Sequence, residues 1–446
     1  MISTFVRAVA VVLLLAAGQT PAAARVFDPE TFTLANGMQV VVVTNRRAPI
    51  VTHMVWYRAG AGDEVQGRSG IAHFLEHLMF KGTEEVGPGE FSRIVARNGG
   101  RDNAFTSHDY TGYFQNVARD RLEAVMRLES DRMANLSLRE DEVLSERDVI
   151  LEERRQVIDS RPPARLREQL FAALFLNHPY GRPIIGWLHE MRTLTRQDAI
   201  DWYRRWYAPN NAVLIVAGDI SAAELRPLAE RTYGAIPARP VPARARPQEP
   251  PPQTARRVEL RDERVQQPNF SRLWLAPSYR SPGGEHAYAL EVLADILGGG
   301  QTARLPRALV EERNLAVNAG AFYDPDALDQ TTFGISASPR PGVDIAALEA
   351  AVDEELARVV ADGVSPGEVA RAIQRMQDSA VFGRDSLQTG ARVFGQVLTT
   401  GGTIEDVEQW PERIAAVTAE QVNAAARAVL RPEASVTGLL LPRVRR

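Results

Sequence analysis

The stretch His73-Phe74-Leu75-Glu76-His77 is the segment of the sequence with the most specific chemistry. Two histidines four positions apart, with a glutamate directly before the second, form the inverted HxxEH pattern of a zinc site. On an α-helix, His73 and His77 lie roughly 40° apart, and Glu76 lies roughly 60° to the other side of His73. The three side chains therefore share one face, where two neutral imidazoles can bind Zn²⁺ and the carboxylate can hold a water molecule.

The composition limits the classes of protein to which this chain can belong. At 446 residues the chain is too long for one typical core, so we expect two to three domains. A hydrophobic content of 45% and a charged content of 24% are typical of a soluble globular protein. The net charge of −4 gives no reason to expect nucleic acid as a partner. The absence of Cys excludes disulfides, thiolate catalysis and Cys-ligated zinc.

Residues 1–24 are predicted to be a cleavable secretory signal peptide. Arg7 supplies the positive charge, Ala8 to Ala17 is a short apolar core, and Ala22-Ala23-Ala24 offers a cleavage site. The alternative is an N-terminal membrane anchor, although the apolar core is too short for a span. The signal peptide predicts a periplasmic or secreted protein. No stretch of the chain has 18 consecutive apolar residues, so we expect the mature chain to lack a membrane span.

A proline-rich segment divides the mature chain nearly in half. Residues 237–252 contain seven Pro, which predicts an extended linker without packing. We therefore expect an N-terminal domain over 25–236, a linker over 237–256 and a C-terminal domain over 257–446. The order strand, helix, strands, helices, strand recurs in both halves, which predicts an internal duplication. Only the first half carries the metal motif.

The elements around the motif raise the question of a third ligand. A helix through Phe80 carries the motif, residues 102–117 are predicted to form a hairpin, and residues 140–158 a charged helix. Glu146 and Glu153 are seven positions apart and lie within about 20° on one face of that helix. Spacing alone leaves Glu142, Glu146 and Glu153 open as ligands, and a solvated charged helix is the alternative.

The motif and its surroundings resemble a known family. His73 to His77, with Glu153 following 76 positions after His77, is similar to the insulinase/pitrilysin zinc peptidases, particularly the processing-peptidase group. The loop 178–186 and the strand 211–219 share this resemblance. It implies an α+β fold of two homologous α/β-sandwich halves, each a mainly antiparallel sheet with helices packed on it. This is the metallohydrolase fold of the LuxS and mitochondrial processing peptidase type.

The resemblance also implies roles for individual residues. His73, His77 and Glu153 would bind one Zn²⁺ per chain, with Glu76 as general base and Glu146 as a nearby acid that orients a ligand. The residues expected on an edge strand that pairs with an extended peptide are Asn103, Ala104 and Phe105. An ordinary core hairpin is the alternative for that strand. The expected reaction is hydrolysis of extended peptides or unfolded polypeptides.

The second half departs from the family pattern. The family often has an Arg and a Tyr seven positions apart that hold the substrate, but the corresponding residues here are Val310 and Val317. Arg313 is out of register, because Gly320 lies seven positions after it. The resemblance then implies a homologous partner subunit that supplies this pair, making this chain the catalytic half of a heterodimer. A chain that acts alone or as a homodimer is left open.

Two rival functions are considered. A non-catalytic or weakly active binding and assembly subunit is the first, but such a member is expected to lose a ligand or the base. This chain retains all four residues of the expected site. A mitochondrial-type presequence-processing subunit is the second, and the secretory character of residues 1–24 argues against it.

Overall fold

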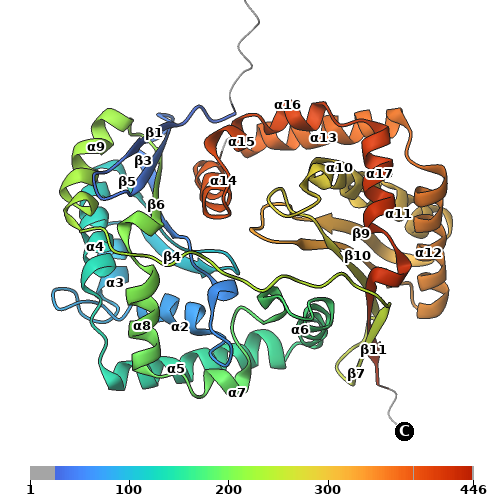
Figure 1. Ribbon diagram of the computed structural model, residues 1–446, viewed down its shortest axis with the longest axis horizontal. Coiled ribbons are helices and arrows are strands. Elements are labelled where there is room, and N and C mark those ends of the chain that lie inside the picture. The colour runs from blue at the N-terminus through green and yellow to red at the C-terminus, as the bar shows by residue number, and fades with distance from the viewer. Residues whose placement is uncertain (1–25, 385, 444–446) are drawn as a thin grey trace, which may run out of the picture.

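The computed structural model describes residues 26–384 and 386–443 and contains two helix-covered sheets (Figure 1). The predicted signal peptide over 1–24 lies outside the described residues. The first sheet has the order β1-β2-β6-β3-β5-β4 and the second the order β7-β11-β8-β10-β9. The strands are β1 (Glu30–Thr33), β2 (Gln39–Thr44), β3 (Ile50–Tyr57), β4 (Arg101–Thr106), β5 (Thr111–Ala118), β6 (Ala212–Gly218), β7 (Arg256–Asp262), β8 (Asn269–Ala276), β9 (Ala316–Tyr323), β10 (Thr331–Pro339) and β11 (Ser435–Pro442).

The two sheets repeat one topology, which confirms the expected pair of homologous halves. In the first half β2 pairs parallel to β6, and in the second half β7 pairs parallel to β11. All other pairs in both sheets are antiparallel. If β1 is set aside, β2 to β6 correspond in order and direction to β7 to β11. The fold is therefore an α+β duplication, as the sequence predicts.

Helices lie on the sheets of both halves (Figure 1). Those of the first half are α2 (Ile71–Leu78), α3 (Glu90–Arg97), α4 (Leu122–Asn135), α5 (Glu140–Arg154), α6 (Pro162–Leu174), α7 (Leu188–Met191), α8 (Arg196–Trp206) and α9 (Ala222–Arg231). Those of the second half are α10 (Ala287–Gly298), α11 (Arg304–Pro306), α12 (Ile345–Asp362), α13 (Pro366–Gly383), α14 (Leu387–Thr399), α15 (Ile404–Glu408), α16 (Trp410–Ala415) and α17 (Ala419–Val429). None of the described helices is long and apolar enough to cross a membrane.

Each half sends one helix onto the sheet of the other half. Helix α14 packs on β6 and β3 of the first sheet, and α6 packs on β11 and β7 of the second. A glycine permits the close approach in both cases. A Cβ at Gly395 would lie 2.0 Å from the ring of Trp56, and a Cβ at Gly438 would lie 2.5 Å from Leu170. The buried apolar surface between the halves is thus built reciprocally.

The proline-rich segment differs from the expected free spacer. It has no helix or strand before β7, but Arg246 within it is buried and contacts carboxylates from both halves. Strand β7 was also not predicted from the sequence. Most residues of β7 are charged, and its side chains alternate between exposed and half-buried, because one face of the strand packs on α6 and the other does not.

The charged helix over 140–158 differs from the prediction at its end. The α-helix α5 stops at Arg154 and a π-helical turn follows over Arg155–Asp159. The wider turn is closed by Ser160 N–H donating to Arg155 O at 2.8 Å. Such single turns change the phase of a helix and are frequent at functional sites. Here the turn follows Glu153 directly, and its Val157 and Ile158 line the same cavity as Glu153.

Candidate metal centre

Helix α2 carries the HxxEH motif and begins where two chain segments cross closely. Gly70 precedes the helix with φ of +89°, and a Cβ there would lie 2.6 Å from Ile185 O. The Glu64 carboxyl group accepts hydrogen bonds from the backbone N–H groups of Gly70 and Ala72 at 3.0–3.1 Å. Burial raises the pKa of Glu64 to about 8. Glu64 thus fixes the start of the helix that presents the two histidines.

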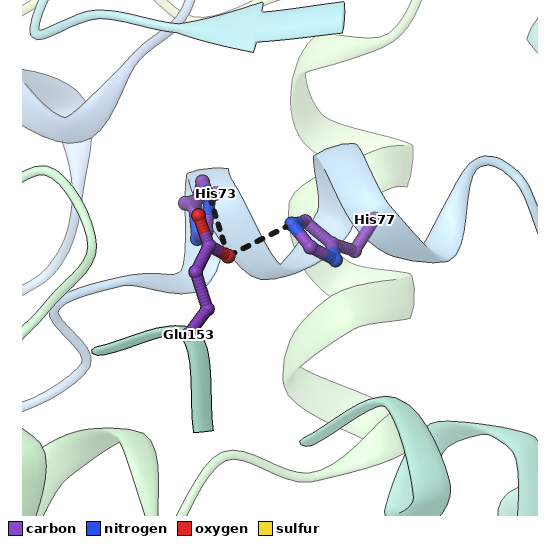
Figure 2. A group of neighbouring side chains, drawn as sticks. All are labelled: His73, His77 and Glu153. Atoms are coloured by element: carbon purple, nitrogen blue, oxygen red, sulfur yellow. Dashed lines mark ion pairs between the residues drawn. The ribbon is translucent and has the colours of Figure 1, made fainter. Parts of the chain in front are cut away.

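The structure brings His73, His77 and Glu153 together (Figure 2). Glu153 Oε2 lies 3.3 Å from His77 Nε2 and 3.7 Å from His73 Nε2. One ligand atom from each residue can be chosen so that all three lie within 4.8 Å of one another. Helix α2 supplies both imidazoles and α5 supplies the carboxylate from its last turn. Two imidazoles and a carboxylate around one point are the donors of a catalytic zinc site.

Glu146 holds the outer side of His77. Its Oε1 lies 2.8 Å from His77 Nδ1, and its Oε2 pairs with Lys81 Nζ. Although burial opposes ionisation of both groups, their mutual hydrogen bond raises the pKa of His77 to about 9 and, together with Lys81, lowers that of Glu146. If His77 keeps its Nδ1–H on Glu146, a metal that binds at Nε2 replaces only the proton on that nitrogen.

The charges around the group suit a bound cation. Burial, followed by the charge of His77, lowers the pKa of His73 to about 4, which gives the neutral imidazole that metal binding requires. The interaction with His77 lowers the pKa of Glu153, so the carboxylate is ionised. Glu153 Oε2 is buried and accepts no hydrogen bond of normal geometry from the described residues. These residues fit a divalent cation, which would satisfy that oxygen.

Glu76 lies beside this group and is held by one hydrogen bond. Thr106 Oγ1 donates to Glu76 Oε2 at 2.6 Å. Burial raises the pKa of Glu76, and the Thr106 hydroxyl partly counteracts that effect. A raised pKa makes this carboxylate a better proton acceptor than an ordinary Glu. Thr106 was not predicted from the sequence, because it lies 30 positions from Glu76 on a different element.

Thr106 ends strand β4, which is one of the two edge strands of the first sheet. The predicted peptide-pairing residues are on this strand, which Thr106 links to Glu76. Ala104 packs with the core on the side of α2. The ring of Phe105 packs on the opposite face of the sheet, 4.8 Å from the ring of Trp56. Asn103 is exposed, and its Oδ1 accepts from Ala104 N–H at 2.9 Å.

A cavity of about 560 Å³ opens beside the metal group. His73, Glu76 and Glu153 line one part of it, and β4 lines another. The remaining wall comes from α6 and from the loop at 180–185, which was part of the family resemblance. Most of its surface is apolar, as expected for a binding site.

Some residues of this site were predicted from the sequence, and others were not. It did not single out Glu64, Lys81 or Thr106. Lys81 had a visible signal, since it is the only Lys in the chain and follows His77 by four positions. Val310 and Val317 lie in the second half, where Val310 packs against the core and Val317 is 44% exposed on β9.

Comparison with known proteins identifies the family. The profile described as "Insulinase (Peptidase family M16)" matches residues 39–187, and that described as "Peptidase M16 inactive domain" matches residues 193–376. The chain belongs to the insulinase family. The second profile begins ahead of α8 and covers most of the half without the metal motif.

Individual members of the insulinase family are similar over most of the chain. The zinc protease PqqE of Helicobacter pylori is 33% identical over 328 residues, which is 72% of each chain. A probable β subunit of the mitochondrial processing peptidase of Arabidopsis thaliana is 28% identical over 89% of this chain and 75% of its own length. A crystal structure of a protease from Helicobacter pylori superposes with a TM-score of 0.86 at 27% identity, covering 93% of this chain and all of that one. The relatives named zinc proteases agree with a metallopeptidase family.

Proposed function

We propose that this chain is a zinc endopeptidase whose metal ligands are His73, His77 and Glu153. The observation that carries the proposal is the convergence of these three side chains beside the buried carboxyl group of Glu76. The names of its relatives point to the same metal and the same class of reaction. We assign the catalytic domain to residues 25–236, the linker to 237–256 and the second domain to 257–446.

The roles of the residues follow from their positions. A zinc ion bound at this group supplies a water molecule of lowered pKa and a Lewis acid for the scissile carbonyl. Glu76 accepts the proton of the attacking water and passes it to the leaving amine. Thr106 orients Glu76 through its 2.6 Å hydrogen bond. Glu146 holds His77 in the tautomer that leaves Nε2 available.

Strand β4 is the proposed peptide-binding edge. Among the described residues no strand pairs with its outer side, so an extended peptide can add there by backbone pairing. Asn103, Ala104 and Phe105 would take part through their backbone groups, because the Phe105 ring packs away from α2. Recognition through backbone groups selects extended or unfolded polypeptides rather than folded proteins.

The export of the chain and its partner are further parts of the proposal. The character of residues 1–24 supports a periplasmic or secreted protein. Val310 and Val317 replace the substrate-holding Arg and Tyr, which supports a heterodimer in which a homologous subunit supplies that pair. A relative named as a subunit of a processing peptidase is compatible with this arrangement. Low activity of the purified chain, restored by a co-expressed homologue from the same host, is the expected result.

Substitution of the base tests the catalytic role. Glu76→Gln should bind zinc like the parent protein but should not hydrolyse an internally quenched peptide. Glu152→Gln is the matched control, since Glu152 is exposed and pairs with Arg155 on the outer side of α5. Peptidase activity in zinc-loaded Glu76→Gln would contradict the proposal. A parent protein that binds zinc and remains inactive with its co-expressed homologue would also contradict it.

A further inference from the structure

The cavity beside the metal group contains more ionisable side chains than the proposed reaction uses. His73, Glu76 and Glu153 line it near α2, while Arg167, Glu168 and Arg182 line its far wall. Arg167 and Glu168 come from α6, and Arg182 comes from the loop that follows. The charge that this wall offers to a ligand depends on which of these groups already have partners.

Each carboxylate of the cavity either has an Arg partner or belongs to the metal centre. Glu168 receives two hydrogen bonds from the guanidinium of Arg154, at 2.8 and 3.0 Å. Arg154 is itself buried and also donates to Gly186 O at 2.8 Å. This bidentate pair neutralises Glu168 within the protein. The other two carboxylates, Glu76 and Glu153, belong to the metal centre described above.

The guanidinium groups of the cavity are not neutralised in this way. Arg167 is exposed, and within the described part of the chain it has no carboxylate within ion-pair distance. Its guanidinium lies 5.2 Å from the ring centre of Phe171, one turn further along α6. Phe171 also lines the cavity, so this cation–π contact holds the charge at the cavity wall. Arg182 donates to the backbone oxygen of Glu64 at 3.1 Å.

We propose that Arg167 is a specificity-determining residue that favours peptides with an acidic side chain close to the scissile bond. The proposal rests on the peptidase function given above. An Asp or Glu of the peptide that enters the cavity meets a wall with a free Arg167 and with Glu168 already paired. A guanidinium offers several N–H donors to a carboxylate and can bind it bidentately. A Lys or Arg of the peptide at the same position would instead meet a like charge.

The alternative is that Arg167 only covers the aromatic ring of Phe171, as long basic side chains do on many helices. In that case the cavity would discriminate peptides by shape alone. The two interpretations differ in how the enzyme responds to charge at one substrate position, and this response can be measured.

The test begins with one internally quenched peptide that the zinc-loaded protein cleaves at a mapped bond. Each position within four residues of that bond is replaced in turn by Glu, Gln or Lys, and kcat/KM is measured. At one or two positions we expect Glu to exceed Lys by about twofold to fivefold, the range for an exposed charge pair. This ratio should fall as the salt concentration rises.

Substitutions on α6 then assign the preference to a residue. Arg167→Glu should invert the Glu-to-Lys ratio, and Arg167→Gln should bring it close to one. Arg161→Glu makes the same charge change at the N-terminal end of the same helix but outside the cavity lining, and should keep the parent ratio. Equal cleavage of the three peptides by the parent protein would overturn the proposal. A parent-like ratio in both Arg167 variants would also overturn it.

A binding measurement separates this proposal from the proposed function. The fluorescence anisotropy of labelled Glu and Lys peptides is measured with Glu76→Gln, which should bind peptides without turning them over. Tighter binding of the Glu peptide, lost in Glu76→Gln combined with Arg167→Glu, supports the role of Arg167 even if the parent protein proves inactive. Equal binding of both peptides refutes the role of Arg167 and leaves the proposed function to its own test.

Discussion

Replacing Glu146 by Leu tests whether α5 controls the metal affinity of the histidine pair. In the structure Glu146 Oε1 lies 2.8 Å from His77 Nδ1, and Oε2 pairs with Lys81. Leu is close to Glu in size but removes the hydrogen-bond acceptor and the negative charge. The Nδ1–H of His77 then has no acceptor from α5, and the imidazole loses the partner that fixes its tautomer.

The expected size of the effect follows from the position of Glu146 behind a ligand. Loss of such an outer partner typically costs 10- to 100-fold in metal affinity, which corresponds to about 1.4–2.8 kcal/mol. The unpaired charge of Lys81 adds to this, because the ammonium group is only partly exposed and repels a second cation. We therefore expect the zinc dissociation constant of Glu146→Leu to rise toward the upper end of that range. Removing both partners, in Glu146→Leu with Lys81→Met, should recover part of the affinity.

The assay is competition between the protein and a chromogenic chelator for zinc at fixed pH, with circular dichroism to verify folding. Glu142→Leu is the control, since Glu142 lies one turn earlier on α5 and pairs with the exposed Arg139. It was also one of the acids that sequence spacing left open as a ligand. The reasoning would be refuted if Glu146→Leu bound zinc as tightly as the parent protein. Equal losses in the two variants would refute it as well, because they would indicate a general effect on the helix.

Three further predictions concern the base, the helix start and the contact between the halves. Glu64 keeps a proton up to a pKa of about 8 when folded, whereas the unfolded chain releases it near 4.5, so stability should fall as pH rises between these values. Urea unfolding should show this fall, at roughly 1 kcal/mol per pH unit, and Glu64→Gln should lessen it. Thr106→Val removes the donor that lowers the pKa of Glu76, so the acidic limb of the pH profile of kcat/KM should move to higher pH. Gly395→Val would bring a Cβ within 2.0 Å of Trp56 and should destabilise the protein by at least about 1–3 kcal/mol in the same unfolding assay.

The parts of the fold that follow from local patterns were predicted from the sequence. The β-branched and aromatic content of 102–117 predicted the β4–β5 hairpin, and the helical spacing of His73 and His77 predicted a shared face. The duplication was visible because the order of elements repeats along the chain. These features depend on neighbouring residues, so a sequence without relatives is enough to predict them.

Apart from the meeting of Glu153 with the two histidines, which the family resemblance implied, contacts between distant segments were not predicted, because no local pattern encodes them. The hydrogen bond from Thr106 to Glu76 joins a strand to a helix, and both residue types are common in any chain. The packing of α14 on the first sheet left one local sign, the glycine at position 395 within that helix. The half-buried face of β7 could not be recognised in the sequence, because most residues of the strand are charged. In each case the decisive partner lies far away in the sequence.

The buried position of Arg246 bears on how a partner subunit would act. Its guanidinium contacts Asp63 and Asp109 of the first half at 2.5–3.0 Å and Asp329 of the second half at 3.0 Å. Asp109 also accepts a hydrogen bond from the hydroxyl of Tyr180, which lines the metal cavity. Removing one member of a buried charge network typically costs about 3–5 kcal/mol, so the linker joins the halves firmly next to the cavity.

A homologous subunit therefore cannot simply displace the second half to reach the metal centre. Displacement would separate α14 from the first sheet and α6 from the second, and α6 carries the Arg167 wall of the cavity. The wall and the interface between the halves share one helix, so loss of the interface would also dismantle the binding site. This chain has Val310 and Val317 where the family often has an Arg and a Tyr. If a partner supplies that pair, it must approach the open side of the cavity while both halves of this chain stay in place.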